Sequence, residues 1–241
     1  MNRIDAAAAI ADAAPIDFVP SAVLFDMDGL LIESERVLLE CWRIAARERA
    51  LDLDDDLWLS MIGLHEAACR QLLIDRVGAA HASALVADLE VHYGLRVEAG
   101  LPVKADAPDI LEWLVRCEVP RAVATSTARR RALLKLERGG LLSYFSAVAC
   151  GDEVEHPKPA PDVYLLAARR LGVDPARCVV LEDSAPGVRA ALAAGMTPIQ
   201  VPDLVAPDAA TRALGHRIMP SLRQAQTLLA PAFAARVPTD R

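Results

Sequence analysis

Short apolar runs recur along the chain, and each has the length and the polar or Gly-rich flanks of a buried strand. They cover Ala22–Asp26, Arg121–Thr125, Ala147–Cys150, Cys178–Glu182 and Pro198–Val201, with a weaker run at Arg217–Met219. Helical patterns fill most of the intervals, over Asp109–Arg116, Ala128–Arg138, Pro161–Leu171 and Gly187–Ala194. This alternation predicts an α/β fold in which helices cover both faces of a parallel sheet.

One interval breaks the alternation. From Glu33 to about Gly100 the pattern is helical throughout, and it predicts helices at Arg36–Arg49, Asp55–Met61, Glu66–Val77 and Ser83–Val91. Four helices can bury a core of their own. We therefore expect a helical cap domain at 34–100, inserted into a core domain made of 21–33 and 101–241, and a weakly ordered arm at 1–20. The alternative is a helical layer that packs passively on the sheet.

Composition limits the classes of partner. Apolar residues make up 54% of the 241 residues and aromatic residues 4%, so the core is expected to be mostly aliphatic. The net charge of −7 argues against nucleic acid and anionic membranes as partners. Five cysteines without a C-x-x-C pair favour a reducing, cytoplasmic setting. We expect a monomer or a weak homodimer.

Two carboxylates end the first strand run. Asp26 and Asp28 are two residues apart, so on an extended chain they point the same way. Carboxylates held together where a strand leaves the core repel each other and resist ionisation unless a cation is near. The plainer alternative is a solvated loop with two turn-forming acids.

Polar clusters follow later strand runs as well: Thr125-Ser126-Thr127, Lys158 in a Pro-rich segment, and Glu182-Asp183-Ser184. Ligands of parallel sheets bind beyond the carboxyl ends of the strands. Paired carboxylates suit Mg²⁺, whereas a hydroxyl before a helix and a Lys suit an anion. Together these groups describe phosphoryl transfer, in which positioning and charge neutralisation do most of the catalysis.

The same residues resemble the motifs of the haloacid dehalogenase (HAD) superfamily. Asp26-Met27-Asp28-Gly29 is similar to its D-x-D-G motif, and Thr125, Lys158 and Glu182-Asp183 follow in the family's order. The resemblance runs from about Ser21 to Met219. It places the chain in the branch of helical-cap (type C1) sugar-phosphate phosphatases, phosphoglycolate phosphatases and beta-phosphoglucomutase-like proteins. The implied fold is a Rossmann-like, doubly wound parallel sheet with an inserted four-helix cap.

The resemblance also implies a reaction, the hydrolysis of a small phosphorylated metabolite through an aspartyl-phosphate intermediate. Asp26 would attack phosphorus, and Asp28 would protonate the leaving oxygen and then activate water. Thr125 and Lys158 would hold the transferring phosphoryl oxygens.

Mg²⁺ is the implied cofactor. Asp26 and Asp183 would bind it through their side chains and Asp28 through its backbone carbonyl. Glu182 would be either a direct ligand or an outer residue.

Substrate contacts are expected from two loops. Ser126 follows Thr125 at the second strand end. Gly63, His65, Glu66 and Arg70 belong to a segment that resembles the family's specificity loop in the cap. His65 could equally be a solvated residue near a helix start.

Two alternatives to a phosphatase remain open, a sugar phosphomutase and a receiver-type domain. Sugar phosphomutases of the family carry His and Arg at the cap positions that Leu38 and Glu66 occupy here, so hydrolysis is favoured. Asp28 argues against dehalogenation, because dehalogenases lack an acid at that position. A receiver-type phospho-accepting domain uses similar residues, but there the acidic pair comes first in the chain and the phosphorylated Asp later.

Overall fold

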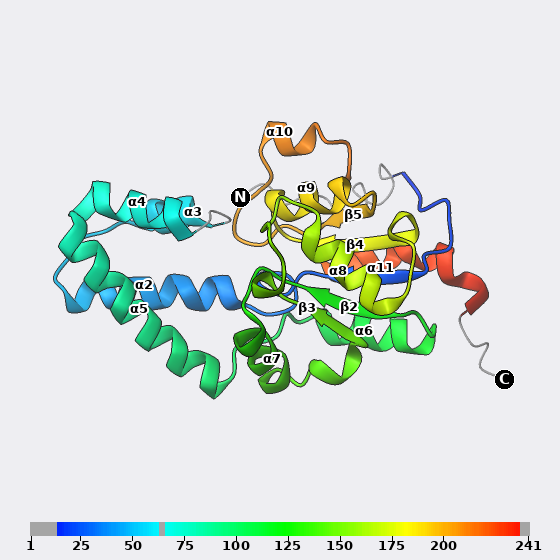
Figure 1. Ribbon diagram of the computed structural model, residues 1–241, viewed down its shortest axis with the longest axis horizontal. Coiled ribbons are helices and arrows are strands. Elements are labelled where there is room, and N and C mark those ends of the chain that lie inside the picture. The colour runs from blue at the N-terminus through cyan, green and yellow to red at the C-terminus, as the bar shows by residue number, and fades with distance from the viewer. Residues whose placement is uncertain (1–13, 63–65, 237–241) are drawn as a thin grey trace.

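The computed structural model describes residues 14–62 and 66–236 (Figure 1). Its strands are β1 (Ala22–Phe25), β2 (Arg121–Ala124), β3 (Ala147–Ala149), β4 (Cys178–Glu182), β5 (Thr197–Gln200) and β6 (Arg217–Ile218). Its α-helices are α2 (Ser34–Glu48), α3 (Asp55–Met61), α4 (Glu66–Val77), α5 (Ala79–Ala99), α6 (Ala107–Arg116), α7 (Arg129–Arg138), α8 (Asp162–Leu171), α9 (Ala185–Ala193), α10 (Ala209–Arg212) and α11 (Leu222–Leu229). Short 3₁₀ helices are η1 (Leu142–Tyr144), η2 (Gly151–Glu153), η3 (Pro175–Arg177) and η4 (Ala230–Arg236).

In the described residues the six strands form one parallel sheet in the order β3-β2-β1-β4-β5-β6. This is the order of a doubly wound Rossmann-like sheet, so the predicted fold class is confirmed. Each strand lies within one residue of the prediction at both ends. The strand order reverses between β1 and β4, which places the ends of these two strands side by side where a ligand site is expected.

Side chains of β1 show how both faces of the sheet are buried. Successive residues point to opposite faces. Val23 and Phe25 pack in the core on the side of α6, α7 and α11, and Ala22 and Leu24 pack on the side of α8 and α9. All four are fully buried. The near-continuous apolar strands of the sequence therefore follow from a sheet with helices on both faces (Figure 1).

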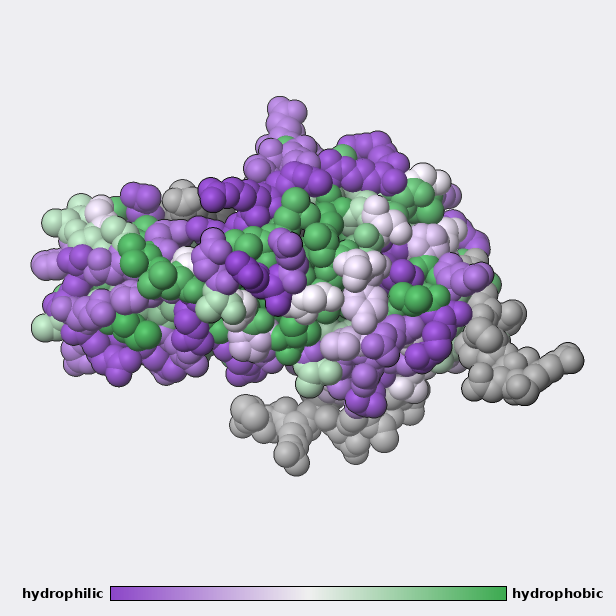
Figure 2. Space-filling model, turned by 90° about the horizontal axis from the view of Figure 1, so that it is seen from below, coloured by the Kyte–Doolittle hydropathy of each residue, from purple (hydrophilic) through white to green (hydrophobic). Residues whose placement is uncertain are grey.

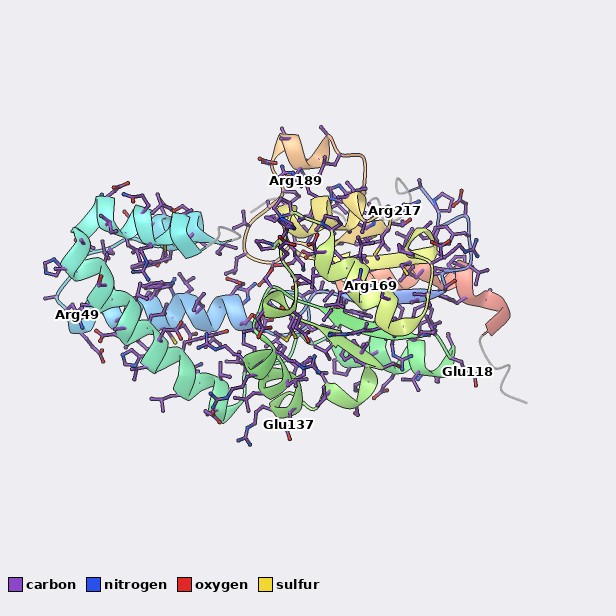
Figure 3. The ribbon with its side chains drawn as sticks, in the orientation of Figure 1. Arg49, Glu118, Glu137, Arg169, Arg189 and Arg217 are labelled. Atoms are coloured by element: carbon purple, nitrogen blue, oxygen red, sulfur yellow. The ribbon has the colours of Figure 1, made fainter. Side chains whose placement is uncertain are left out.

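Helices α2 to α5 form a group beside the sheet, connected to it after β1 and before α6 (Figure 1). The rings of Trp42 and Trp58 stack inside this group, with centroids 5.1 Å apart. At its outer end Arg49, labelled in Figure 3, donates a hydrogen bond to Asp88 on α5. The predicted insertion of four helices is confirmed for the described residues.

Helix α5 is longer than predicted. Its expected bounds, Ser83–Val91, are wrong at both ends, because the helix runs from Ala79 to Ala99 and continues through Gly94. Tyr93 and Val97 are buried in the main core, and the end of α5 packs on α7. Tertiary packing therefore sustains a helix that local propensity alone does not extend past Gly94.

Hydrophilic residues cover most of the face seen in Figure 2, and hydrophobic residues gather toward its middle. Within the described parts of the chain, every helix is too short or too polar to cross a lipid bilayer.

The described part of the N-terminal arm, residues 14–20, packs on the core. Ile16 is buried. The guanidinium of Arg217, which Figure 3 labels beside this segment, donates hydrogen bonds to the carbonyls of Ala14 and Pro15, both at 2.6 Å. The expectation of weak order for residues 1–13 lies outside the described residues.

Two short segments, one through Ile32 and the other through Val103, join the helical group to the sheet. The carboxylate of Asp203 forms ion pairs beside both segments. Ile32 and Val103 form an antiparallel bridge between the segments. Asp203, whose side chain is 4% exposed, accepts hydrogen bonds from Lys104 Nζ at 2.6 Å and from Arg36 Nη2 at 3.0 Å. Lys104 therefore connects the segment that leads into α6 to a shielded carboxylate.

We predict that Lys104→Met lowers the free energy of unfolding by about 1–3 kcal/mol. The buried Asp203 carboxylate then keeps only Arg36, which is more exposed to solvent than Lys104. Urea denaturation at pH 7 measures this. Arg223→Met is the control, since Arg223 is exposed and pairs with Asp106 and Asp109 at the surface. We expect it to cost less than about 0.5 kcal/mol. Equal stability of both variants would contradict the role of Lys104.

Candidate active site

The loop after β1 is shaped by its glycine. Asp26 N–H donates to the carbonyl of Leu181, so the chain stays in the ladder until the first acid. Gly29 then turns with a φ of +83°, a conformation that favours glycine. A Cβ at Gly29 would overlap the Asp183 carboxylate. The D-x-D-G sequence therefore lets the β1 loop close against the acidic loop after β4.

A cavity of about 540 Å³ opens at this edge of the sheet. Six of the residues predicted for the site line it: Asp26, Asp28, Thr125, Ser126, Lys158 and Asp183. The opposite wall includes Leu38, Leu89, Glu90 and Tyr93 from the helical group. The polar strand ends of the sheet and the inserted helices therefore enclose one space.

Lys158 forms hydrogen bonds to two of the acids, Asp26 and Glu182. Its Nζ donates to Asp26 Oδ1 at 2.5 Å, to Glu182 Oε1 at 2.7 Å and to the carbonyl of Ala124 at 3.1 Å. The ammonium also lies 4.7 Å from the centroid of the Tyr164 ring. Burial lowers the pKa of a lysine, but the two carboxylates outweigh that effect, and the pKa of Lys158 is raised well above its usual value. It therefore stays charged.

Glu182 is held on both oxygens. Oε1 accepts from Lys158 Nζ and from the hydroxyl of Tyr164, and Oε2 accepts from the backbone N–H and the hydroxyl of Ser184. Gly187 makes room for it, because a Cβ there would overlap the carboxylate. Ser184 also caps α9 by accepting from Gly187 N–H. Capping and site construction thus share the same residues.

The acids form one cluster. Ligand atoms of Asp26, Glu182 and Asp183 lie within 4.8 Å of one another. Burial and the charges of Glu182 and Asp28 raise the pKa of Asp26 to about 7, although Lys158 lowers it. Burial and neighbouring carboxylates raise the pKa of Asp183 well above its usual value. Such a set of repelling oxygen donors is the chemistry that a hard divalent cation prefers.

Asp28 has a different environment from Asp26. Lys135 Nζ donates to its Oδ1 at 2.6 Å, and Thr127 Oγ1 donates to its Oδ2 at 2.6 Å. Burial acts to raise the pKa of Asp28, but Lys135 and these hydrogen bonds outweigh it, so the pKa lies below its usual value. The two carboxylates of one motif therefore have different environments, Asp26 among other acids and Asp28 beside a lysine and a threonine hydroxyl.

Sequence reasoning missed Lys135 and Tyr93. Lys135 lies with Ala132 and Leu136 on the buried stripe of α7, and its side chain is 3% exposed. A lysine on the apolar stripe of a helix that follows Thr125 was the available indication. Tyr93, which approaches Lys135 from α5, had no such indication, because it reads as an ordinary apolar residue of an amphipathic helix.

The predicted cap contacts are less complete. Gly63 and His65 lie outside the described residues, as does the side chain of Glu66 at the start of α4. Arg70 is exposed on α4 and is absent from the described lining of the cavity. These four assignments stay predictions.

Comparison with known proteins agrees with this geometry. The family model of haloacid dehalogenase-like hydrolases matches residues 20–195. The chain belongs to this family. The predicted family is thereby confirmed, and the receiver-type alternative is excluded because this chain is a HAD hydrolase.

Relatives of this HAD hydrolase act on small phosphate esters. It is 34% identical to the fructose-1-phosphate phosphatase YqaB of Escherichia coli, over 75% of this chain and 96% of the relative. It is 33% identical to a phosphorylated carbohydrates phosphatase of Thermotoga maritima, over 73% and 82% of the two chains. A crystal structure of a HAD family hydrolase from Deinococcus radiodurans superposes with a TM-score of 0.78 at 32% identity, covering 92% of this chain and all of that one. That crystal contains bound phosphate and sodium.

We predict that Lys135→Met lowers kcat of this HAD hydrolase about 10–100-fold, because Asp28 loses the partner that orients it and sets its charge. Steady-state hydrolysis of p-nitrophenyl phosphate measures the effect. Lys104→Met, which removes a partly buried lysine away from the cavity lining, serves as the control. Similar kcat values for the two variants would contradict a role of Lys135 in catalysis.

Proposed function

We propose that this chain is a Mg²⁺-dependent phosphatase that hydrolyses a small phosphorylated metabolite through an aspartyl phosphate on Asp26. The arrangement of Asp26 and Asp28 in one cavity, each beside a buried lysine, is the observation that carries the proposal. One carboxylate lies among repelling acids beside Lys158, and the other is paired with Lys135. The proposal also rests on phosphatase relatives that this chain matches over 96% and 82% of their length.

The donor set at the strand ends fits Mg²⁺. Asp26 and Asp183 present carboxylate oxygens close together, and a cation between them would relieve the repulsion that raises both pKa values. We propose these two side chains and the Asp28 carbonyl as ligands. Glu182 would be an outer residue, because Lys158, Tyr164 and Ser184 already occupy both its oxygens. Bound Mg²⁺ would neutralise charge on the phosphoryl oxygens.

In the first step a carboxylate oxygen of Asp26 forms a bond to phosphorus, and the bond from phosphorus to the leaving oxygen breaks. Lys158 Nζ and the Thr125 hydroxyl hold phosphoryl oxygens during the transfer. A bound phosphate dianion adds negative charge beside Asp28 and raises its pKa, so that Asp28 can carry the proton that leaves with the product alcohol.

In the second step Asp28, now a carboxylate, takes a proton from water. The resulting hydroxide attacks phosphorus, and the bond between phosphorus and Asp26 breaks to release inorganic phosphate. Asp28 regains its proton, so the cycle is balanced. Lys135 and Thr127 keep the Asp28 carboxylate in place for both transfers.

Hydrolysis is favoured over a mutase reaction by the cap wall. Leu38 lines the cavity where mutases of the family carry a proton-transferring His, and a leucine cannot move a proton. We also propose 34–100 as a cap domain that shields the intermediate from uncontrolled solvent access. The cytoplasmic location and the monomer or weak homodimer stay predictions.

We predict that Asp26→Asn abolishes Mg²⁺-dependent hydrolysis of p-nitrophenyl phosphate, lowering kcat more than about 10³-fold, because an amide is a poor nucleophile toward phosphorus. Release of inorganic phosphate measures it. Asp109→Asn, on the exposed side of α6, is the matched control. Turnover by Asp26→Asn at the control's rate would exclude Asp26 as nucleophile.

We also predict a pH-dependent effect of Mg²⁺ on stability. Burial raises the pKa of Asp26 and of Glu35 to about 7, so between pH 5 and 8 the native state binds more protons than the unfolded state, and stability falls as pH rises. The lowered pKa values of Asp28 and Glu182 act in the opposite direction only at lower pH.

Mg²⁺ at about 100 times its Kd should raise Tm by about 5–10 °C at pH 8, and clearly less at pH 5.5, where protons compete for the same oxygens. Thermal melts with Mg²⁺ and with EDTA measure this. A larger gain at pH 5.5 than at pH 8 would contradict the proposed ligand set.

A further inference from the structure

Two helices that pack against each other, α5 and α7, both contribute side chains to the cavity lining. On α5, Glu90 and Tyr93 are one turn apart, and on α7, Arg131 and Lys135 are one turn apart. All four line the cavity. Arg131 Nη2 donates to Glu90 Oε2 at 2.6 Å, and the Tyr93 ring lies 6.0 Å from the Arg131 guanidinium and 5.2 Å from Lys135 Nζ.

The order of these groups sets the direction of the leaving group. Lys135 holds Asp28, the residue proposed to protonate the leaving oxygen. Arg131 lies roughly 5–6 Å further along the same face of α7. A short carbon chain that extends from the leaving oxygen over the Tyr93 ring therefore reaches the Glu90–Arg131 pair. Both members of the pair are about half exposed, so substrate groups can replace the water around them.

Each cation in the described lining of the cavity already has a carboxylate partner, and two further acids, Glu35 and Asp183, also line it. Among the described lining residues, Lys158 pairs with Asp26, Lys135 with Asp28, and Arg131 with Glu90. A second anionic group on the substrate would meet Glu90 and would have to compete for Arg131.

A substrate hydroxyl group suits the Glu90–Arg131 pair better than an anion does. It can donate a hydrogen bond to a Glu90 oxygen and accept one from an Arg131 N–H that does not bond to Glu90. The apolar wall formed by Leu38, Leu89 and Tyr93 suits the C–H face of such a compound.

We infer that Glu90 and Arg131 determine specificity, selecting phosphomonoesters of uncharged polyhydroxy compounds and rejecting substrates with a second anionic group. The inference rests on the proposed phosphatase function and goes beyond it by naming the chemistry of the leaving group. Glu90 disfavours a second anionic group for two reasons. Its carboxylate repels the anion, and it already pairs with Arg131, the cation that would otherwise attract the anion.

Glycerol 3-phosphate and 3-phosphoglycerate test this directly, because they share one carbon skeleton and differ by a hydroxymethyl group against a carboxylate. We measure kcat/KM for both with Mg²⁺ present. The wild type should prefer glycerol 3-phosphate by about tenfold or more. Glu90→Gln should reduce this preference about tenfold, because the carboxylate of 3-phosphoglycerate can then pair with Arg131. The double variant Glu90→Gln/Arg131→Gln should lose that gain.

Arg131→Gln gives a test of opposite sign. It leaves Glu90 unpaired in the cavity, so the preference for glycerol 3-phosphate should increase. Glu98→Gln is the matched control, because Glu98 and Arg138 form a second ion pair between α5 and α7, away from the cavity lining. Its ratio of kcat/KM values should equal that of the wild type. The ratio cancels differences in the fraction of active protein, so partial misfolding of a variant does not obscure the result.

Three outcomes would overturn the inference: equal use of both esters by the wild type, an unchanged ratio in Glu90→Gln, or a ratio that shifts equally in Glu98→Gln. Hydrolysis of p-nitrophenyl phosphate separates these failures from a failure of the proposed function. If the wild type hydrolyses no ester at all, both the proposed function and this inference fall.

Discussion

The crowding of carboxylates at one edge of the sheet is the constraint on which the rest of the site depends. Asp26, Glu182 and Asp183 meet there because β1 and β4 are adjacent and end together. Burying like charges this closely is unfavourable unless cations are fixed among them. Lys158, which bonds to both Asp26 and Glu182, supplies the nearest one. Much of the surrounding architecture can be understood as the means of placing cations in that region.

The chain uses its lysines to neutralise shielded carboxylates, and two of them lie at this edge of the sheet. It contains three, and each pairs with a shielded carboxylate: Lys104 with Asp203, Lys135 with Asp28, and Lys158 with Asp26. The exposed cations are arginines instead. An ammonium is a compact point charge that fits between carboxylates, whereas a guanidinium needs a flat, wider space. Residue choice therefore separates cations that build the site and its connections from cations that cover the surface.

Sequence patterns were sufficient where the constraint is local. The strand before Asp26 and Asp28 alternates faces along an apolar run, and this periodicity survives whatever packs on it. The order of the polar strand ends also allowed Thr125, Lys158 and Asp183 to be predicted as neighbours. The length of α5 could not be predicted, since the packing of Tyr93 and Val97 on distant residues sustains it. Helix α11 was missed for a related reason, because its short amphipathic pattern follows the weakest strand.

The contacts of Asp28 show the same limit at the level of chemistry. Its identity and spacing indicated an acid–base role, but its charge state depends on Lys135, a residue more than a hundred positions away along the chain. Lys135 is in turn shielded by Tyr93 from the inserted helices. Helices α5 and α7 therefore join the acid–base residue to the wall that faces the leaving group. Changes in that wall can alter substrate choice while the strand ends keep the phosphoryl chemistry, which is how one sheet can serve relatives with different substrates.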